Sequence, residues 1–287
     1  MKKNRGIKFI KGLAIIALAG MVITGCKKST TTTDSDTNSS NENSFAQARF
    51  DEAGNISDQA AANSITSYRL SGNANNGSIL SSCATIRFDT VNHPDSIIVN
   101  FGTTNCLCHD GRYRRGIIYI TYTKPHYWDS LDVITLTFSN YYVNDYGISG
   151  TKTVTNMGRV GGYPTWNCTV VNGMITKPAS QGGGSYTWNS NITRKQTAGM
   201  STPWIWYTYV YQYTGNSNGV SSNGNGYTAV ITNPLVYDLS CPWCFVQGTI
   251  DFTPTGHPMR IIDYGTGSCT GTVTVNISGT IYTVHVW

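Results

Sequence analysis

The sequence predicts an all-β protein, an antiparallel meander of hairpins that forms a sandwich, a rolled sheet or an open barrel. Three observations favour this class. Thr, Val, Ile, Tyr and Gly, which are typical of strands and turns, dominate after about residue 70. Apolar and polar residues alternate with period two, as in 134–138 and 273–277. Turn signals recur at Asn172-Gly173, Asn223-Gly224 and Ser278-Gly279.

Helices are not favoured over the same region. The chain has two glutamates, Glu42 and Glu52, and both precede the region that we expect to fold. Glutamate is a common helix residue, so its absence after residue 70 fits strands. We expect one all-β domain over 70–287, preceded by a short helix over 58–69.

The first 25 residues have the features of an export signal. Basic residues precede an apolar run over 13–23, which is too short to span a bilayer, and Gly25-Cys26 follows. This arrangement resembles the lipobox of bacterial lipoproteins. The resemblance implies that 1–25 is a lipoprotein signal peptide, that Cys26 is lipidated, and that the membrane is a partner through that anchor. We read 26–57 as the lipidated cysteine plus a disordered polar tether.

The charge balance argues against a nucleic-acid partner. The chain has a net charge of +5, and the five basic residues before Cys26 account for all of that surplus. The remaining chain is neutral, whereas nucleic-acid binding needs a basic excess. Charged residues make up 12% of the chain, about half the usual share.

An internal repeat links the two ends of the β region, over 82–124 and 240–287. The first copy contains, in order, Thr85-Ile86-Arg87-Phe88, His93-Pro94, Ile97-Ile98, Phe101-Gly102-Thr103 and Cys106. The second copy contains the corresponding series Thr249-Ile250-Asp251-Phe252, His257-Pro258, Ile261-Ile262, Tyr264-Gly265-Thr266 and Cys269. A Ser-Cys pair opens each copy, at Ser82-Cys83 and Ser240-Cys241. We therefore interpret each copy as a duplicated β-hairpin module.

The repeat also suggests how the cysteines pair. An exported protein uses cysteines mainly in disulfides. Equivalent positions predict the pairs Cys83–Cys106 and Cys241–Cys269. The cysteines that remain are Cys108, Cys168 and Cys244, and two of these could pair.

With the repeat included, the chain resembles a group of uncharacterised lipoproteins from Bacteroidota-type bacteria. The likeness covers most of 80–287. It rests on 101–106, 110–112, 115–116, 140–141, 150–151, 153–156 and 263–265. The resemblance brings no known activity. Lys27 and Lys28 follow Cys26. Lipoproteins of such bacteria that are exported to the cell surface often have acidic residues at these positions, and lipoproteins that are kept in the inner membrane have Asp directly after the cysteine. The resemblance thus implies an outer-membrane lipoprotein, facing the periplasm or the cell surface.

Several segments have residue types that suit catalysis or metals. Cys241-Pro242-Trp243-Cys244 matches a redox motif, but a strand context favours a structural disulfide. Cys106, Cys108 and His109 together with Cys241 and Cys244 have zinc-ligand types. The loops at Asp110 and Asp263 have calcium-ligand types. For each we favour the structural interpretation. We expect no catalytic residue, no metal and no cofactor.

Aromatic residues remain as the main candidate for function. Exposed Trp and Tyr can stack on sugar rings, although large rings more often fill cores. The candidate ligand-stacking residues are Trp128, Trp188, Trp204, Trp206 and Trp243. We expect a non-catalytic envelope lipoprotein that binds a glycan or an envelope protein or has a structural role. The alternatives are a polymer hydrolase that uses Asp residues, such as Asp129 and Asp132, and a carrier of a lipid or other apolar ligand.

Overall fold

One helix and one antiparallel sheet make up the part of the chain that the structure describes. This computed structural model describes residues 34–64, 79–203, 205–241 and 245–285, all within one unit, Asp34–Trp287. The helix is α1 (Asn38–Ala62). The strands are β1 (Thr85–Asp89), β2 (Asp95–Asn100), β3 (Cys106–Leu107), β4 (Tyr113–Tyr122), β5 (Val133–Val143), β6 (Tyr146–Val160), β7 (Tyr163–Thr176), β8 (Ser185–Ala198), β9 (Val210–Val220), β10 (Gly226–Asp238), β11 (Phe245–Pro254), β12 (Arg260–Thr266), β13 (Thr272–Ile277) and β14 (Thr280–His285). Two short 3₁₀ helices are η2 (Ala179–Gln181) and η3 (Trp206–Thr208).

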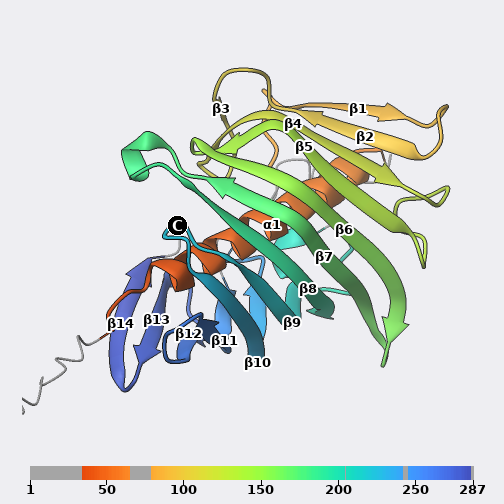
Figure 1. Ribbon diagram of the computed structural model, residues 1–287. Helices are drawn as coiled ribbons and strands as arrows, with labels where there is room; N and C mark the ends of the chain where they lie inside the picture. Colours follow the sequence, from red (N-terminus) through yellow and green to blue (C-terminus); the bar gives the residue numbers. More distant parts are fainter. Residues whose placement is uncertain (1–33, 65–78, 204, 242–244, 286–287) are drawn as a thin grey trace, which may run out of the picture. The chain divides into compact units, whose positions relative to one another are not determined.

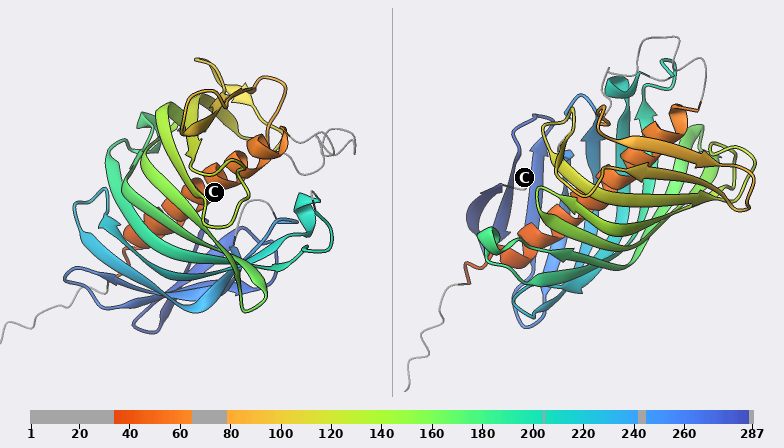
Figure 2. Two further views of the ribbon diagram at one scale, coloured as in Figure 1. Left: turned by 90° about the vertical axis from the view of Figure 1, so that its right-hand side faces the viewer. Right: turned by 90° about the horizontal axis from the view of Figure 1, so that it is seen from above.

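The sheet is a meander of antiparallel strands, which confirms the predicted fold class. Its order follows the sequence from β1 to β14, except that the short β3 pairs with β4 beside this path. The strands form one sheet rather than the two layers of a sandwich, and the sheet is not closed into a barrel. Figures 1 and 2 show the strands curving around α1, which lies along the concave face.

Period-two alternation places one side of each strand against this interior. On β5, Ile134 and Leu136 are buried, whereas Thr135 is half-buried and Thr137 is exposed. Thr135 lies opposite Thr121 of β4 and Thr153 of β6, so a row of neutral hydroxyl groups crosses these three strands on the outer face. The apolar face is therefore available to cover α1.

One predicted turn is wrong, because Asn172-Gly173 lies inside β7. The pairing of β7 with β8 shifts register between Val170 and Gly173, which forms a bulge. A Cβ at Gly173 would meet the Trp188 carbonyl oxygen at 2.3 Å and the Phe50 ring at 3.1 Å. Only glycine allows this close approach of β7 to β8 and to α1. Bulges also increase strand twist and bending, which helps the sheet curve around the helix.

The helix α1 contradicts two sequence predictions. It begins at Asn38, so a disordered tether over 26–57 is wrong for 38–57, and it ends at Ala62, so the helix predicted over 58–69 is displaced. Positions 65–69 lie outside the described residues. Of the 25 residues of α1, 22 are buried, although most are polar. Their composition suggested contact with water, but their side chains contact the sheet instead.

Five acids of the segment that carries α1 meet bases from the sheet. The closest N–O distances are 2.8 Å for Asp34–Arg260, 3.2 Å for Glu42–Lys177, 3.1 Å for Asp51–Lys152, 2.6 Å for Glu52–Arg112 and 3.5 Å for Asp58–Arg194. An unpaired charge in this interior would cost several kcal/mol. The pairs therefore favour one position of α1 along the concave face.

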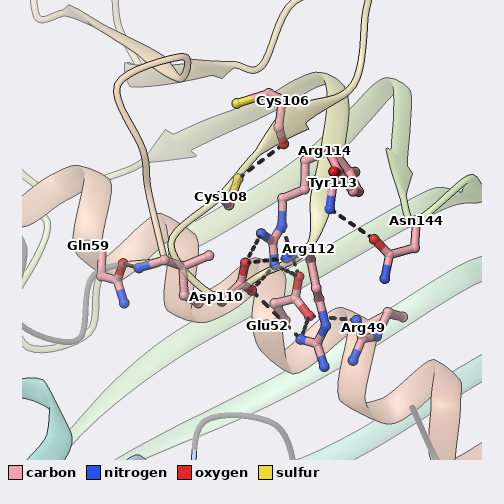
Figure 3. A network of polar contacts seen from close by, with 11 residues as sticks. Arg49, Glu52, Gln59, Cys106, Cys108, Asp110, Arg112, Tyr113, Arg114 and Asn144 are labelled. Carbon is pink, nitrogen blue, oxygen red and sulfur yellow. Dashed lines mark hydrogen bonds and ion pairs between the residues drawn. The ribbon is translucent and has the colours of Figure 1, made fainter.

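Glu52 stands at the centre of a larger cluster (Figure 3). Its carboxylate accepts hydrogen bonds from Arg112 and Arg114 and pairs with Arg49 at 2.8 Å. The fully buried Arg114 also donates to Asp110, in the loop between β3 and β4. Burial alone would raise the pKa of Glu52, but the three surrounding guanidinium groups outweigh it and lower this pKa to about 2.

The smaller polar contacts of α1 fix its rotation. The Asn43 amide oxygen accepts hydrogen bonds from Trp188 Nε1 at 2.9 Å and from Ser217 at 2.8 Å. Phe50 stacks on Trp188 with ring centroids 5.5 Å apart. A rotated helix would lose these contacts together.

The repeated modules form equivalent hairpins, β1–β2 and β11–β12, that differ in register by one residue. Phe88 pairs with Ile97, whereas the equivalent Phe252 pairs with Arg260. As a result Ile97 is 1% exposed and its counterpart Ile261 is 40% exposed. The duplication therefore preserves the hairpin topology, but the equivalent isoleucines of β2 and β12 face opposite sides of the sheet.

Both predicted disulfide pairs are confirmed by the structure. Cys83–Cys106 and Cys241–Cys269 are joined, with Cα atoms 5.9 and 5.7 Å apart. The buried Cys108 and Cys168 are free thiols, and burial raises the pKa of each. Cys244 lies outside the described residues.

We predict that Glu52→Gln lowers the free energy of unfolding at pH 7 by about 3–5 kcal/mol, because it leaves buried guanidinium groups short of a counter-charge. The folded-state pKa of Glu52 is about 2, against 4.5 for the ordinary side chain. The Glu52 contribution is therefore complete above about pH 4.5 and is lost as the pH falls towards 2.

Chemical unfolding of both proteins from pH 7 to pH 2 measures this difference. The matched control is Asp145→Asn, which removes a largely exposed pair with Arg115 and is expected to cost less than about 1 kcal/mol. A wild-type advantage that stays constant across this pH range would contradict the prediction.

We also predict that peptide mapping without reduction recovers linked peptides for Cys83–Cys106 and Cys241–Cys269. Cys108 and Cys168 are expected to resist thiol reagents until the protein is unfolded, since both are buried. Recovery of a Cys83–Cys241 linkage would overturn the pairing.

Candidate functional site

A pocket with a volume of about 330 Å³ lies beside the last turns of α1. This volume is at the lower end of the roughly 300–1,000 Å³ of ligand sites. Residues from the β4–β5 loop, β6, β7, β8, β9 and the η3 segment line it, together with Asp58 of α1. The pocket therefore depends both on the curvature of the sheet and on the position of the helix.

Aromatic rings form most of the wall. Trp128 and Trp166 are half-buried, so part of each ring remains accessible, whereas Trp206, Tyr209 and Tyr211 are buried. Trp166 meets Tyr211 edge-on at 6.1 Å, and Tyr209 meets Trp206 in the same way at 5.4 Å. The buried rings thus support the accessible ones.

An arginine behind the aromatic wall connects it to α1. The guanidinium carbon of Arg194 lies 4.6 Å from the centre of the Trp166 ring and 5.0 Å from that of Tyr211. Arg194 also pairs with Asp58, whose other oxygen accepts a hydrogen bond from the Tyr127 hydroxyl at 2.9 Å. Burial raises the pKa of Asp58, and the attraction of Arg194 opposes that rise.

Trp128 is held in place by β6. The Asn156 amide donates to the backbone oxygens of Trp128 and Asp129, each at 3.0 Å. The Tyr127 ring meets Trp128 edge-on at 4.7 Å. Because these contacts fix the β4–β5 loop, the Trp128 ring is positioned before any ligand arrives.

A second cavity of about 300 Å³ adjoins the first. Trp128 lines both cavities, and Tyr127, His126 and Phe88 help to line the second. The two cavities therefore share Trp128 as a lining residue.

The five predicted ligand-stacking residues do not share one location. Trp128 and Trp206 lie at the pocket. Trp188 is 1% exposed and packs on Phe50 inside the core, so its prediction is wrong. The other two, Trp204 and Trp243, lie outside the described residues.

Sequence reasoning missed Trp166 and Asp58. The sequence carries part of a signal, because Arg194 alternates with the apolar Ile192. That Trp166 is the ring opposite Arg194 follows from the β7–β8 register of the structure. A buried guanidinium group on an apolar strand face is stabilised by an aromatic ring and a carboxylate beside it, so its presence predicts such partners. Nothing in the sequence around Asp58 indicated that it lines a pocket, because it was expected only at the start of a short helix.

The other chemical candidates have structural partners. Cys241 is bound to Cys269, Asp110 pairs with Arg114, and Asp263 accepts the Gly265 backbone N–H at 2.8 Å within a turn. Asp132 accepts the backbone N–H groups of residues 123 and 124. Within the described ranges, no group of three or more His, Cys, Asp or Glu could hold a metal ion.

No helix among the described residues has the length and apolar character needed to cross a membrane. Comparisons of the chain with protein-family models, with curated proteins and with solved structures gave no match.

Proposed function

We propose that this chain is a non-catalytic binding protein of the cell envelope that holds a sugar ring in the pocket between Trp128 and Trp166. The observation that carries the proposal is the pairing of two accessible, supported tryptophans with polar lining residues, among them Asn156, whose amide holds the Trp128 backbone, and the buried Gln196. Such rings stack on the apolar faces of sugars, and the polar groups meet their hydroxyls.

Two observations favour binding over hydrolysis. Hydrolysis of a glycosidic bond by the usual route requires two carboxyl groups across the scissile bond. Asp58 is the one carboxylate among the described residues that line the pocket, and it is engaged by Arg194 and Tyr127. Binding requires no such pair of acids.

The structure also disfavours a carrier of apolar ligands. Such a carrier needs an apolar cavity inside the curved sheet, but α1 occupies the concave face. Ion pairs such as Asp51–Lys152 cross this interior. An apolar ligand would have to replace these pairs at a high cost.

The proposed lipid anchor at Cys26 would tether the folded unit to the membrane. Seven residues separate Cys26 from Asp34, which is already bound to Arg260. Seven extended residues reach at most about 25 Å. We propose an outer-membrane location on either face.

We predict that Trp128→Ala and Trp166→Ala each weaken binding of oligosaccharides by about tenfold, because each removes one stacking face. Isothermal titration calorimetry against a panel of envelope and plant-type oligosaccharides measures the loss. The control is Tyr119→Ala, which truncates an exposed aromatic residue of β4 outside the pocket. If folded Trp128 and Trp166 variants retained wild-type affinity, the pocket would not be the site.

We further predict that Cys26→Ala prevents incorporation of an alkyne-labelled fatty acid and moves the protein out of the detergent phase in a detergent partition assay. Lys27→Ala is the control, because it leaves the cysteine intact. A Cys26→Ala protein that still carried the label would contradict lipidation at this residue.

A further inference from the structure

We infer that the sugar bound in this pocket is anionic, with a carboxylate or sulfate group held by Arg159 at the rim. The inference rests on the proposed function and specifies its ligand class. Arg159 lines the pocket and is exposed at the end of β6. Its guanidinium donates to the Gly162 carbonyl at 2.8 Å, which orients it and leaves further N–H groups available.

Arg159 differs from most other arginines of this protein. Six of the eight described arginines form an ion pair with a carboxylate. These are Arg49, Arg112, Arg114, Arg115, Arg194 and Arg260. Arg159 forms no such pair within the described residues, and it is the one of the remaining two that lies at the pocket. Its charge is therefore available to a ligand.

Lys195 of β8, two strands away from Arg159, faces the other side of the sheet. In the sheet register, Arg159 of β6 lies opposite Pro164 of β7, and Lys195 of β8 lies opposite Thr165. The Lys195 ammonium lies 5.5 Å from the centre of the Tyr163 ring. Residues 194 and 196, on either side of Lys195, are buried on the inner face, so Lys195 does not line the pocket, and Arg159 is the one base among the described lining residues.

The carboxylates near the pocket do not cancel this charge. Asp58 is buried and paired with Arg194. Asp129 adjoins the lining residue Ser130, but its carboxylate accepts the His126 backbone N–H at 3.2 Å, towards the second cavity. A planar guanidinium binds carboxylate or sulfate through two parallel hydrogen bonds. A ring stacked on Trp166 would bring such a substituent to Arg159.

The test compares matched oligosaccharides by isothermal titration calorimetry with the full chain in detergent. The probes are oligogalacturonates with their methyl esters, and carrageenan oligosaccharides with their desulfated forms. We expect the wild type to bind the anionic member of at least one pair about tenfold or more tightly. The two pairs distinguish a carboxylate from a sulfate.

We expect Arg159→Gln to remove this preference and Arg159→Lys to retain part of it. Arg87→Gln, which removes an exposed arginine from β1, is expected to leave it unchanged. Equal binding of charged and neutral members, with loss of both in Trp128→Ala, would overturn the anionic ligand and leave the sugar-binding proposal standing. Absence of binding to every member would overturn both.

Discussion

The structure depends on ion pairs between α1 and the inner face of the sheet. The strands present Arg114, Lys152, Arg194 and other bases towards an interior that is otherwise apolar and aromatic. Without acids to meet them, these charges would oppose formation of the curved sheet. α1 supplies the acids, with Glu52 as the central one, and in return the sheet encloses a segment of weak helix propensity. Each partner therefore makes the other's conformation possible.

These pairs act more on specificity than on total stability. Desolvation cancels much of the attraction between buried charges, so a well-packed apolar helix could be at least as stable. A smooth apolar helix could, however, slide or rotate along the concave face. Here Asp34 meets Arg260 near the start of the segment and Asp58 meets Arg194 near its end, which fixes the axial position. Asn43, between Trp188 and Ser217, fixes the rotation.

The sheet could be predicted from the amino-acid sequence because strand patterns are local. The alternation around Ile134 and Leu136 reports directly which side is buried, and the repeat correctly paired the disulfide cysteines. The burial of α1 could not be predicted in this way, because the residues that bind this segment are far away in the sequence. Asp34 and Arg260, for example, are 226 positions apart. A polar composition normally indicates contact with water. The sequence did contain one indication: Arg194 lies on the same strand face as the apolar Ile192, and a buried arginine requires an acidic partner.

The pocket follows from the same constraint, which explains why only part of it was predicted. Trp128 and Trp206 could be proposed from their residue type alone, but their neighbour Trp166 owes its place to Arg194, and Arg194 owes its place to Asp58. Because Asp58 belongs to α1, seating of the helix and formation of the aromatic wall are one event. A ligand that binds the wall therefore binds only the state in which α1 is enclosed. Such a ligand must stabilise the whole unit, in proportion to its affinity and concentration, without contacting most of it.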